Sequence, residues 1–154
     1  MLSIVDYKAL KRLMVQGRAT WAELAADMGL SAPAAAERVR KLEQQMIIKG
    51  YAALVDPASV GYPLTAFISV ALDRPKHRAG FLQAIHDMDE VVECFHIAGD
   101  GDYLLKVRCR DTADLDQLLT SSIKGVPGIA RTRTTIVLST AKETVASPIV
   151  FDRA

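Results

Sequence analysis

The order of strand and helix patterns after residue 64 constrains the fold of this chain more than any other feature. The alternating run LTAFISVALD predicts a strand, and RAGFLQAIHDM carries apolar residues at helical spacing. The strand patterns VVECFHIA and DYLLKVRC are separated by GDG, which is typical of a hairpin turn. TADLDQLLTSSI predicts a helix that we expect Thr112 to start, and ARTRTTIVLS predicts a last strand. The order β-α-β-β-α-β predicts a ferredoxin-like domain.

This topology places two helices on one face of a four-stranded antiparallel sheet and leaves the other face open. Alternation along the first strand puts Phe67 on the face opposite Ile68 and Val70, so part of the open face is apolar. An exposed apolar sheet face requires a partner, and a second copy of the chain is the simplest one. We therefore expect this domain to oligomerise.

The first fifty residues instead predict three short helices. Thr20 and Glu23 have the spacing of a capping box at the start of the second helix, and Gly29 can end that helix in the left-handed conformation. Ser31 can cap the third helix, with Pro33 in its first turn. Two helices joined by a short turn that contains Gly are typical of a helix-turn-helix. We predict an α+β chain: a winged-helix-like helix-turn-helix domain over residues 1–52, a wing or linker over 53–63, and a βαββαβ sensing and oligomerisation domain over 64–154.

The third helix has two unlike halves, with small residues first and charged residues after them. Its free N–H groups and positive dipole end can face phosphate, while the basic side chains neutralise the DNA backbone. A solvated amphipathic face is the alternative. Residues 1–50 hold eight Lys or Arg against five Asp or Glu, whereas the remainder is slightly acidic, which favours DNA. The expected contacts to double-stranded DNA are Thr20, Trp21, Ser31, Ala32, Pro33, Ala34, Glu37, Arg38, Arg40 and Lys41.

The turn AGDGDYLL is the second candidate site. Gly and Asp suit a hairpin for backbone reasons alone, and this interpretation stays open. The functional alternative is recognition of a zwitterion, in which Asp100 or Asp102 accepts hydrogen bonds from an ammonium group. The N–H groups of Gly99 and Gly101 would then donate to a carboxylate. We expect Asp102 to be exposed in the free protein.

Other chemistry is not indicated. The three histidines have no ligand spacing, and no catalytic constellation, metal site or cofactor motif is present. Cys94 and Cys109 are expected to be buried free thiols. Trp21 is expected to pack, with a contact to a DNA phosphate as the alternative. There is no signal-peptide pattern, and the longest apolar run is too short to cross a bilayer. A cytoplasmic, nucleoid-associated location without membrane contact follows as an expectation.

The segments WAELAADMGLS, ERVRKLE, GDGDYLLKV and GIARTRTTIVLSTAKET, in this order, resemble the Lrp/AsnC family of bacterial and archaeal feast/famine regulators. The resemblance implies a DNA-binding domain, a domain that senses a small effector, usually an amino acid, and homodimers that often assemble into octamers. It also implies an effector pocket between dimers. The residues it assigns to that pocket are Ala98, Gly99, Asp100, Gly101, Asp102, Tyr103, Thr112, Thr134, Thr135 and Ile136.

Two positions depart from the family pattern. An acidic residue is usual where Ser3 stands, and Gly is usual where Met46 ends the third helix. Two alternatives to an effector-responsive regulator remain. One is an enzyme of the sirohaem-decarboxylase type, which resembles the family in fold and length. The other is a regulator whose C-terminal domain only oligomerises.

Overall fold

The computed structural model describes residues 2–150. The chain forms two compact units, and each is described by itself. The first consists of residues 2–54 and 142–150, and the second of residues 55–141. Residues 142–150, predicted to belong to the sensing domain, instead pack with the helical unit, where Ile149 contacts the apolar core. Every helix within the described residues is too short or too polar to cross a lipid bilayer.

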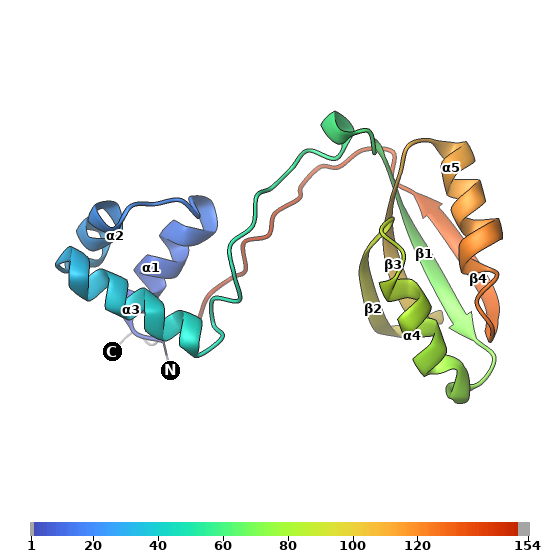
Figure 1. Cartoon of the computed structure of the whole chain (residues 1–154), viewed down its shortest axis with the longest axis horizontal. Helices are drawn as coiled ribbons and strands as arrows, with labels where there is room; N and C mark the ends of the chain where they lie inside the picture. Colours follow the sequence, from blue (N-terminus) through green and yellow to red (C-terminus); the bar gives the residue numbers. More distant parts are fainter. Residues whose placement is uncertain (1, 151–154) are drawn as a thin grey trace. The chain divides into compact units, whose positions relative to one another are not determined.

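The first unit contains three helices, α1 (Ile4–Val15), α2 (Trp21–Met28) and α3 (Ala32–Gln44) (Figure 1). The predicted caps are confirmed: Thr20 and Glu23 form a capping box, and the Oγ of Ser31 accepts from the N–H of Ala34 at 3.4 Å. The helices enclose a small core of alanines and larger apolar side chains, which consists of Ala9, Leu10, Leu24, Ala25, Met28, Ala35, Val39 and Leu42.

The end of α3 forms without its usual glycine. Met46 adopts φ +56°, in the left-handed region that glycine occupies at little cost. The N–H of Ile47 donates to the carbonyl of Leu42 at 2.9 Å, and that of Met46 donates to Glu43 at 2.9 Å. These two bonds form a Schellman motif, which satisfies carbonyls that the helix leaves free. The helix cap therefore forms with Met46 in place of the usual glycine, although methionine fits this conformation less well than glycine does.

The predicted wing does not form within the described residues. No strand forms between α3 and residue 63, and a short 3₁₀ helix, η1 (Ala58–Val60), is the one regular element there. An isolated extended segment gains no ladder hydrogen bonds unless a second strand pairs with it. The preceding residues instead carry large exposed side chains, including Leu54 and Val55.

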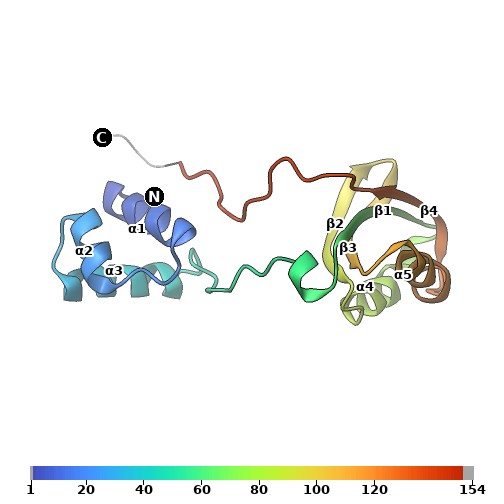
Figure 2. The same ribbon diagram turned by 90° about the horizontal axis from the view of Figure 1, so that it is seen from above.

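The second unit is a four-stranded antiparallel sheet in the order β2-β3-β1-β4. Its strands are β1 (Leu64–Leu72), β2 (Val91–Gly99), β3 (Gly101–Cys109) and β4 (Ile129–Ile136). Its helices are α4 (Arg78–His86), preceded by the 3₁₀ turn η2 (Pro75–His77), and α5 (Thr112–Gln117), which continues as the π-helical segment η3 (Leu118–Ile123). Both helices lie on the same face of the sheet (Figure 2). The predicted βαββαβ topology is confirmed.

The core of this unit lies between the helices and the sheet. Ile68, Leu105 and Val107 are fully buried there beneath Phe81 of α4. α5 begins at Thr112, as predicted. Asp111 caps it, because its carboxylate accepts from the N–H of Asp114 at 2.8 Å.

One of the two cysteines differs from the sequence prediction. Both thiols are free; Cys109 is buried as expected, but Cys94 is exposed. Cys94 pairs with Leu105 and shares its side of the sheet, but it lies on the edge strand β2, most of which is exposed.

The face away from the helices is open and partly apolar, as predicted. Phe95 of β2 pairs with Leu104 of β3, which in turn pairs with Ser69 of β1. Phe67 lies on the same side, because it is two residues from Ser69 along the strand. We call Phe67, Phe95 and Leu104 the open-face patch. Phe95 is 47% exposed and the other two are half-buried, so the patch lacks a covering element within the described chain.

Candidate DNA-binding and effector sites

The first candidate site is the face of α3 that points away from its own core. Ala35, Val39 and Leu42 form the buried stripe of α3, which leaves the opposite face of the helix in solvent. Gly29, at φ +71°, ends α2 and lets the chain turn directly into the Ser31 cap of α3. The start of α3 is therefore presented at the surface.

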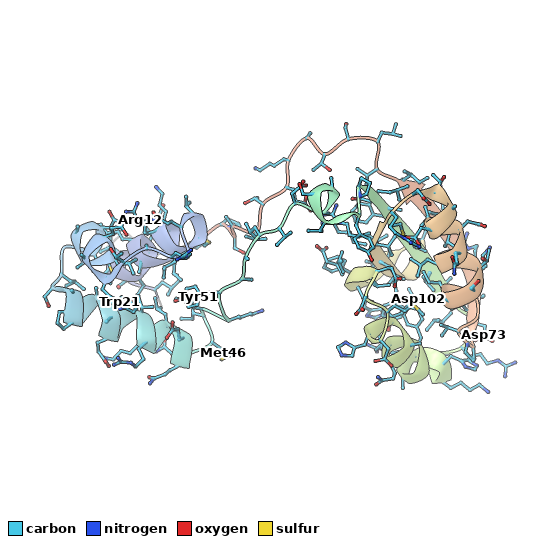
Figure 3. The ribbon with its side chains drawn as sticks, turned by 45° about the horizontal axis from the view of Figure 1, so that its top comes forward. Arg12, Trp21, Met46, Tyr51, Asp73 and Asp102 are labelled. Atoms are coloured by element: carbon cyan, nitrogen blue, oxygen red, sulfur yellow. The ribbon has the colours of Figure 1, made fainter. Side chains whose placement is uncertain are left out.

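Most of the predicted DNA contacts lie on this surface. Thr20 caps α2, and Trp21, its first residue, is 50% exposed rather than packed (Figure 3). On α3, Ala32 is half-buried, whereas Arg40 and Glu37 form an exposed ion pair. The other predicted residues that α3 and its cap expose are Ser31, Pro33, Ala34 and Lys41.

Arg38 differs from the other basic residues of α3. Its Nε lies 2.5 Å from Oδ1 of Asp6, and its Nη2 lies 2.7 Å from Oδ2. The same Nη2 donates to Oγ of Ser3 at 3.0 Å. Ser3 caps α1, and Asp6 completes the capping box through its carboxylate. The guanidinium is thus bound to the start of α1 rather than free on the DNA-facing surface.

Asp6 is also electrostatically unusual. The hydrogen bonds from Arg38 lower the pKa of its carboxyl to about 2, although burial acts in the opposite direction. An acid whose pKa is depressed in the folded state stabilises the fold above its unfolded pKa, near 4, and loses this contribution as the pH falls through the folded value.

We therefore expect the difference in unfolding free energy between wild type and Asp6→Asn to be about 2 kcal/mol at neutral pH, and to disappear between pH 4 and pH 2. Urea unfolding of both proteins at several pH values measures it. A difference that stays constant down to pH 2 would contradict the assignment of the shift to Asp6.

The second candidate site is the turn between β2 and β3. Gly101 has φ +115°, and a side chain there would collide with Oγ of Ser69. That hydroxyl donates to the carbonyl of Asp100 at 2.6 Å, which holds the turn against β1. The exposed carboxylate of Asp100 forms ion pairs with Arg131 and, at 3.6 Å, with Arg133 of β4.

Asp102 is less exposed than the sequence predicted. It is half-buried, and its Oδ2 accepts from the backbone N–H of Leu72 at 2.7 Å (Figure 3). The reason is local: the pairing of β1 with β4 shifts register between Ala71 and Leu72, and the Asp102 carboxylate takes the Leu72 N–H at this irregularity. Asp102 therefore has a structural role at the turn in addition to any role in binding.

Tyr103 follows on the helix-covered side of β3. It is 2% exposed and packs against the rings of Phe81 and His96, with centroid distances of 4.8 and 5.1 Å. Its hydroxyl has no hydrogen-bond partner among the described residues. A buried hydroxyl without a partner carries a cost that a polar ligand group or a water molecule can relieve.

The remaining predicted effector residues do not meet the turn within one chain. Tyr103 pairs with Val70 of β1, whereas Ile136 pairs with Ala66, about 13 Å further along the strand at 3.3 Å per residue. Thr112 follows β3 at this far end. Thr135 also faces the opposite side of β4 from Thr134 and Ile136. Ala98 and Gly99 are exposed beside the turn.

Sequence reasoning missed several residues of both sites. The spacing of Ser3 and Asp6 matches a capping box, so the start of α1 could have been found, but the pairing with Arg38 spans 32 residues and leaves no local signal. Ser69, Arg131 and Arg133 were likewise missed, because only strand register brings them to the turn.

Comparison with known proteins yields two family matches. Residues 2–43 match the AsnC-type helix-turn-helix domain, and residues 65–147 match the Lrp/AsnC ligand binding domain. The first match lies within the first unit, and the second covers most of the second unit and continues to residue 147, in the segment that packs with the first unit.

Whole-chain relatives agree with these matches. The leucine-responsive regulatory protein of Haemophilus influenzae is 37% identical over 145 residues, which cover 93% of this chain and 87% of the relative. The Bkd operon transcriptional regulator of Pseudomonas aeruginosa is 33% identical, with 96% and 98% covered. A solved transcriptional regulator of Neisseria meningitidis, in complex with L-methionine, superimposes with a TM-score of 0.93 at 31% identity and covers 96% of this chain and 97% of its own.

Proposed function

The chain belongs to the Lrp/AsnC family of DNA-binding transcriptional regulators, and we propose that it changes its binding to DNA when an amino acid binds between copies of the chain. The observation that carries the DNA-binding part is the exposed first half of α3. Its small side chains, Pro33 and Ala34, allow the backbone to approach a groove, while Arg40 and Lys41 reach phosphates. We propose Thr20, Trp21, Ser31 and Glu37 as further contacts at the edges of this face.

Few long polar side chains at the start of α3 can make bidentate contacts with bases, so sequence preference should be degenerate and depend in part on DNA shape. We expect Arg40→Ala to weaken binding to many sequences. The slope of log K against log salt concentration should fall in magnitude by about 1, because one phosphate contact is lost. Fluorescence anisotropy at four salt concentrations measures the slope. Arg74→Ala, an exposed change in the second unit, is the control. An unchanged slope in Arg40→Ala would place this face away from DNA.

The amino-acid effector is supported by two relatives and by the turn. One relative is named as leucine-responsive, and the Neisseria regulator binds L-methionine. Leucine and methionine both have uncharged, apolar side chains, and we propose an effector of this class. Asp100 and Asp102 are candidates for the ammonium group, and the N–H groups of the turn are candidates for the carboxylate.

The two ends of the sheet explain why we place this site between copies. The turn with Tyr103 lies at one end, and Thr112 with Ile136 lies at the other. A second copy can bring its far end to the turn of the first, so that Thr112, Thr134, Thr135 and Ile136 are supplied by the neighbour. We propose that homodimers form through the open-face patch and that dimers assemble further, to an octamer, around such sites.

We propose that the chain is not an enzyme and acts on nucleoid DNA in the cytoplasm. The regulator names of its relatives support this role. The sirohaem-decarboxylase alternative is tested directly: sirohaem incubated with the protein should keep its absorbance spectrum over hours. A spectral change that depends on protein concentration would support the alternative instead.

A further inference from the structure

Asp6 is the one buried acidic or basic residue within residues 2–150, at 4% exposure. A buried carboxylate is costly unless it is paired and hydrogen-bonded. Asp6 meets both conditions, because it accepts from the N–H and Oγ of Ser3 at 2.8 and 2.7 Å and from the fork of Arg38. The arrangement joins the first turn of α1 to the middle of α3.

This joint lies at the edge of the apolar core. A hollow of about 220 Å³ lies beside the ion pair and is lined by Leu2, Leu42 and Ile47 as well as by Lys41, Gln45 and the pair itself. Arg38 is one helical turn from the buried Ala35 and Leu42, so it borders the buried stripe of α3. The bidentate pair links the start of α1 directly to this part of α3, and its planar geometry fixes orientation as well as distance.

We propose that Asp6 and Arg38 are positioning residues for DNA binding. The pair sets the rotation and tilt of α3, so that Pro33, Ala34 and Arg40 meet the DNA together, and Arg38 contributes through Asp6 rather than by neutralising a phosphate. This inference rests on α3 being the DNA-facing helix, which Arg40→Ala tests separately.

Asp6→Asn distinguishes the two roles of Arg38 by the sign of its effect. If Arg38 binds phosphate, removing the carboxylate frees its charge and deletes a negative group, so DNA binding should tighten. If the pair positions α3, binding should weaken about tenfold or more at fixed salt, with the salt slope unchanged, because no phosphate contact is removed. The probe is a labelled duplex selected from a random-sequence pool by the wild-type protein. Binding is measured at a temperature at which melting curves show each variant to be folded.

Asp27→Asn is the matched control. Asp27 is exposed and pairs with the half-buried Arg12 of α1 at 3.2 Å in the same unit, so its neutralisation removes the same charge at a site outside α3. We expect this variant to bind DNA as well as wild type or more tightly.

Arg38→Lys provides a second test that keeps the positive charge. A phosphate contact would survive the change, whereas a single ammonium cannot reproduce the fork. We expect a loss as large as in Asp6→Asn, and the double variant Asp6→Asn/Arg38→Gln should bind no more weakly than the worse single variant. Three results would each overturn the proposal. They are wild-type affinity in Arg38→Lys, tighter binding in Asp6→Asn, and a lower melting temperature with unchanged DNA affinity in these variants.

Discussion

Phe95→Asp is expected to convert the assembled protein into monomers. In a two-fold dimer formed through the open-face patch, each substituted residue occurs twice, and both carboxylates would be buried without a partner. We expect the dimer dissociation constant to rise at least a thousandfold, which corresponds to about 4 kcal/mol. The fold itself should survive, because Phe95 is 47% exposed in the single chain and lies on an edge strand. Sedimentation equilibrium over nanomolar to micromolar concentrations measures the change.

Leu82→Asp is the control for this experiment. Leu82 has a similar apolar side chain with 37% exposure, but it lies on α4, on the other side of the sheet. We expect Leu82→Asp to leave dimerisation unaffected. A Phe95→Asp protein that remains a dimer at nanomolar concentration would show that the open face is not the interface.

Asp102→Ala is expected to reduce both stability and the effector response. The structure assigns the carboxylate a hydrogen bond from Leu72, so its removal leaves a half-buried N–H without that partner, at a cost of about 1–3 kcal/mol. Loss of a charge-assisted contact to the effector ammonium should lower its affinity by about one to two orders of magnitude. Melting curves measure the loss of stability. Calorimetric titration measures the loss of affinity, with the amino acid that most raises the melting temperature of the wild type as the ligand.

Asp100→Ala separates the two carboxylates of the turn. Asp100 pairs with arginines in solvent, so its removal should have little effect on stability. If affinity falls in Asp100→Ala and stays unchanged in Asp102→Ala, the ammonium contact belongs to Asp100, and Asp102 is a structural residue only.

Local sequence patterns predicted the parts of the fold that depend on neighbouring residues. Thr20 with Glu23, Gly29 and Ser31 each act within one helical turn, so their caps follow from spacing alone. The order of strands and helices along the second unit followed from the GDG turn and from the patterns of apolar residues. The alternation along the first strand also placed Phe67 on the open face.

Features that depend on distant contacts could not be predicted in this way. The role of Arg38 depends on Asp6, 32 residues earlier, and the burial of Asp102 depends on an irregularity in a neighbouring strand. Cys94 was expected to be buried because its strand is apolar, but the edge position of that strand is a property of the whole sheet.

The response of DNA binding to amino acids tests the account most directly. Anisotropy titrations of the selected duplex should be run without effector and with each of the protein amino acids at millimolar concentration. The account predicts that at least one amino acid with an apolar side chain changes the apparent dissociation constant fivefold or more, which corresponds to a coupling of about 1 kcal/mol. Tight DNA binding that no amino acid alters would contradict it, and would favour a second domain that only assembles the protein.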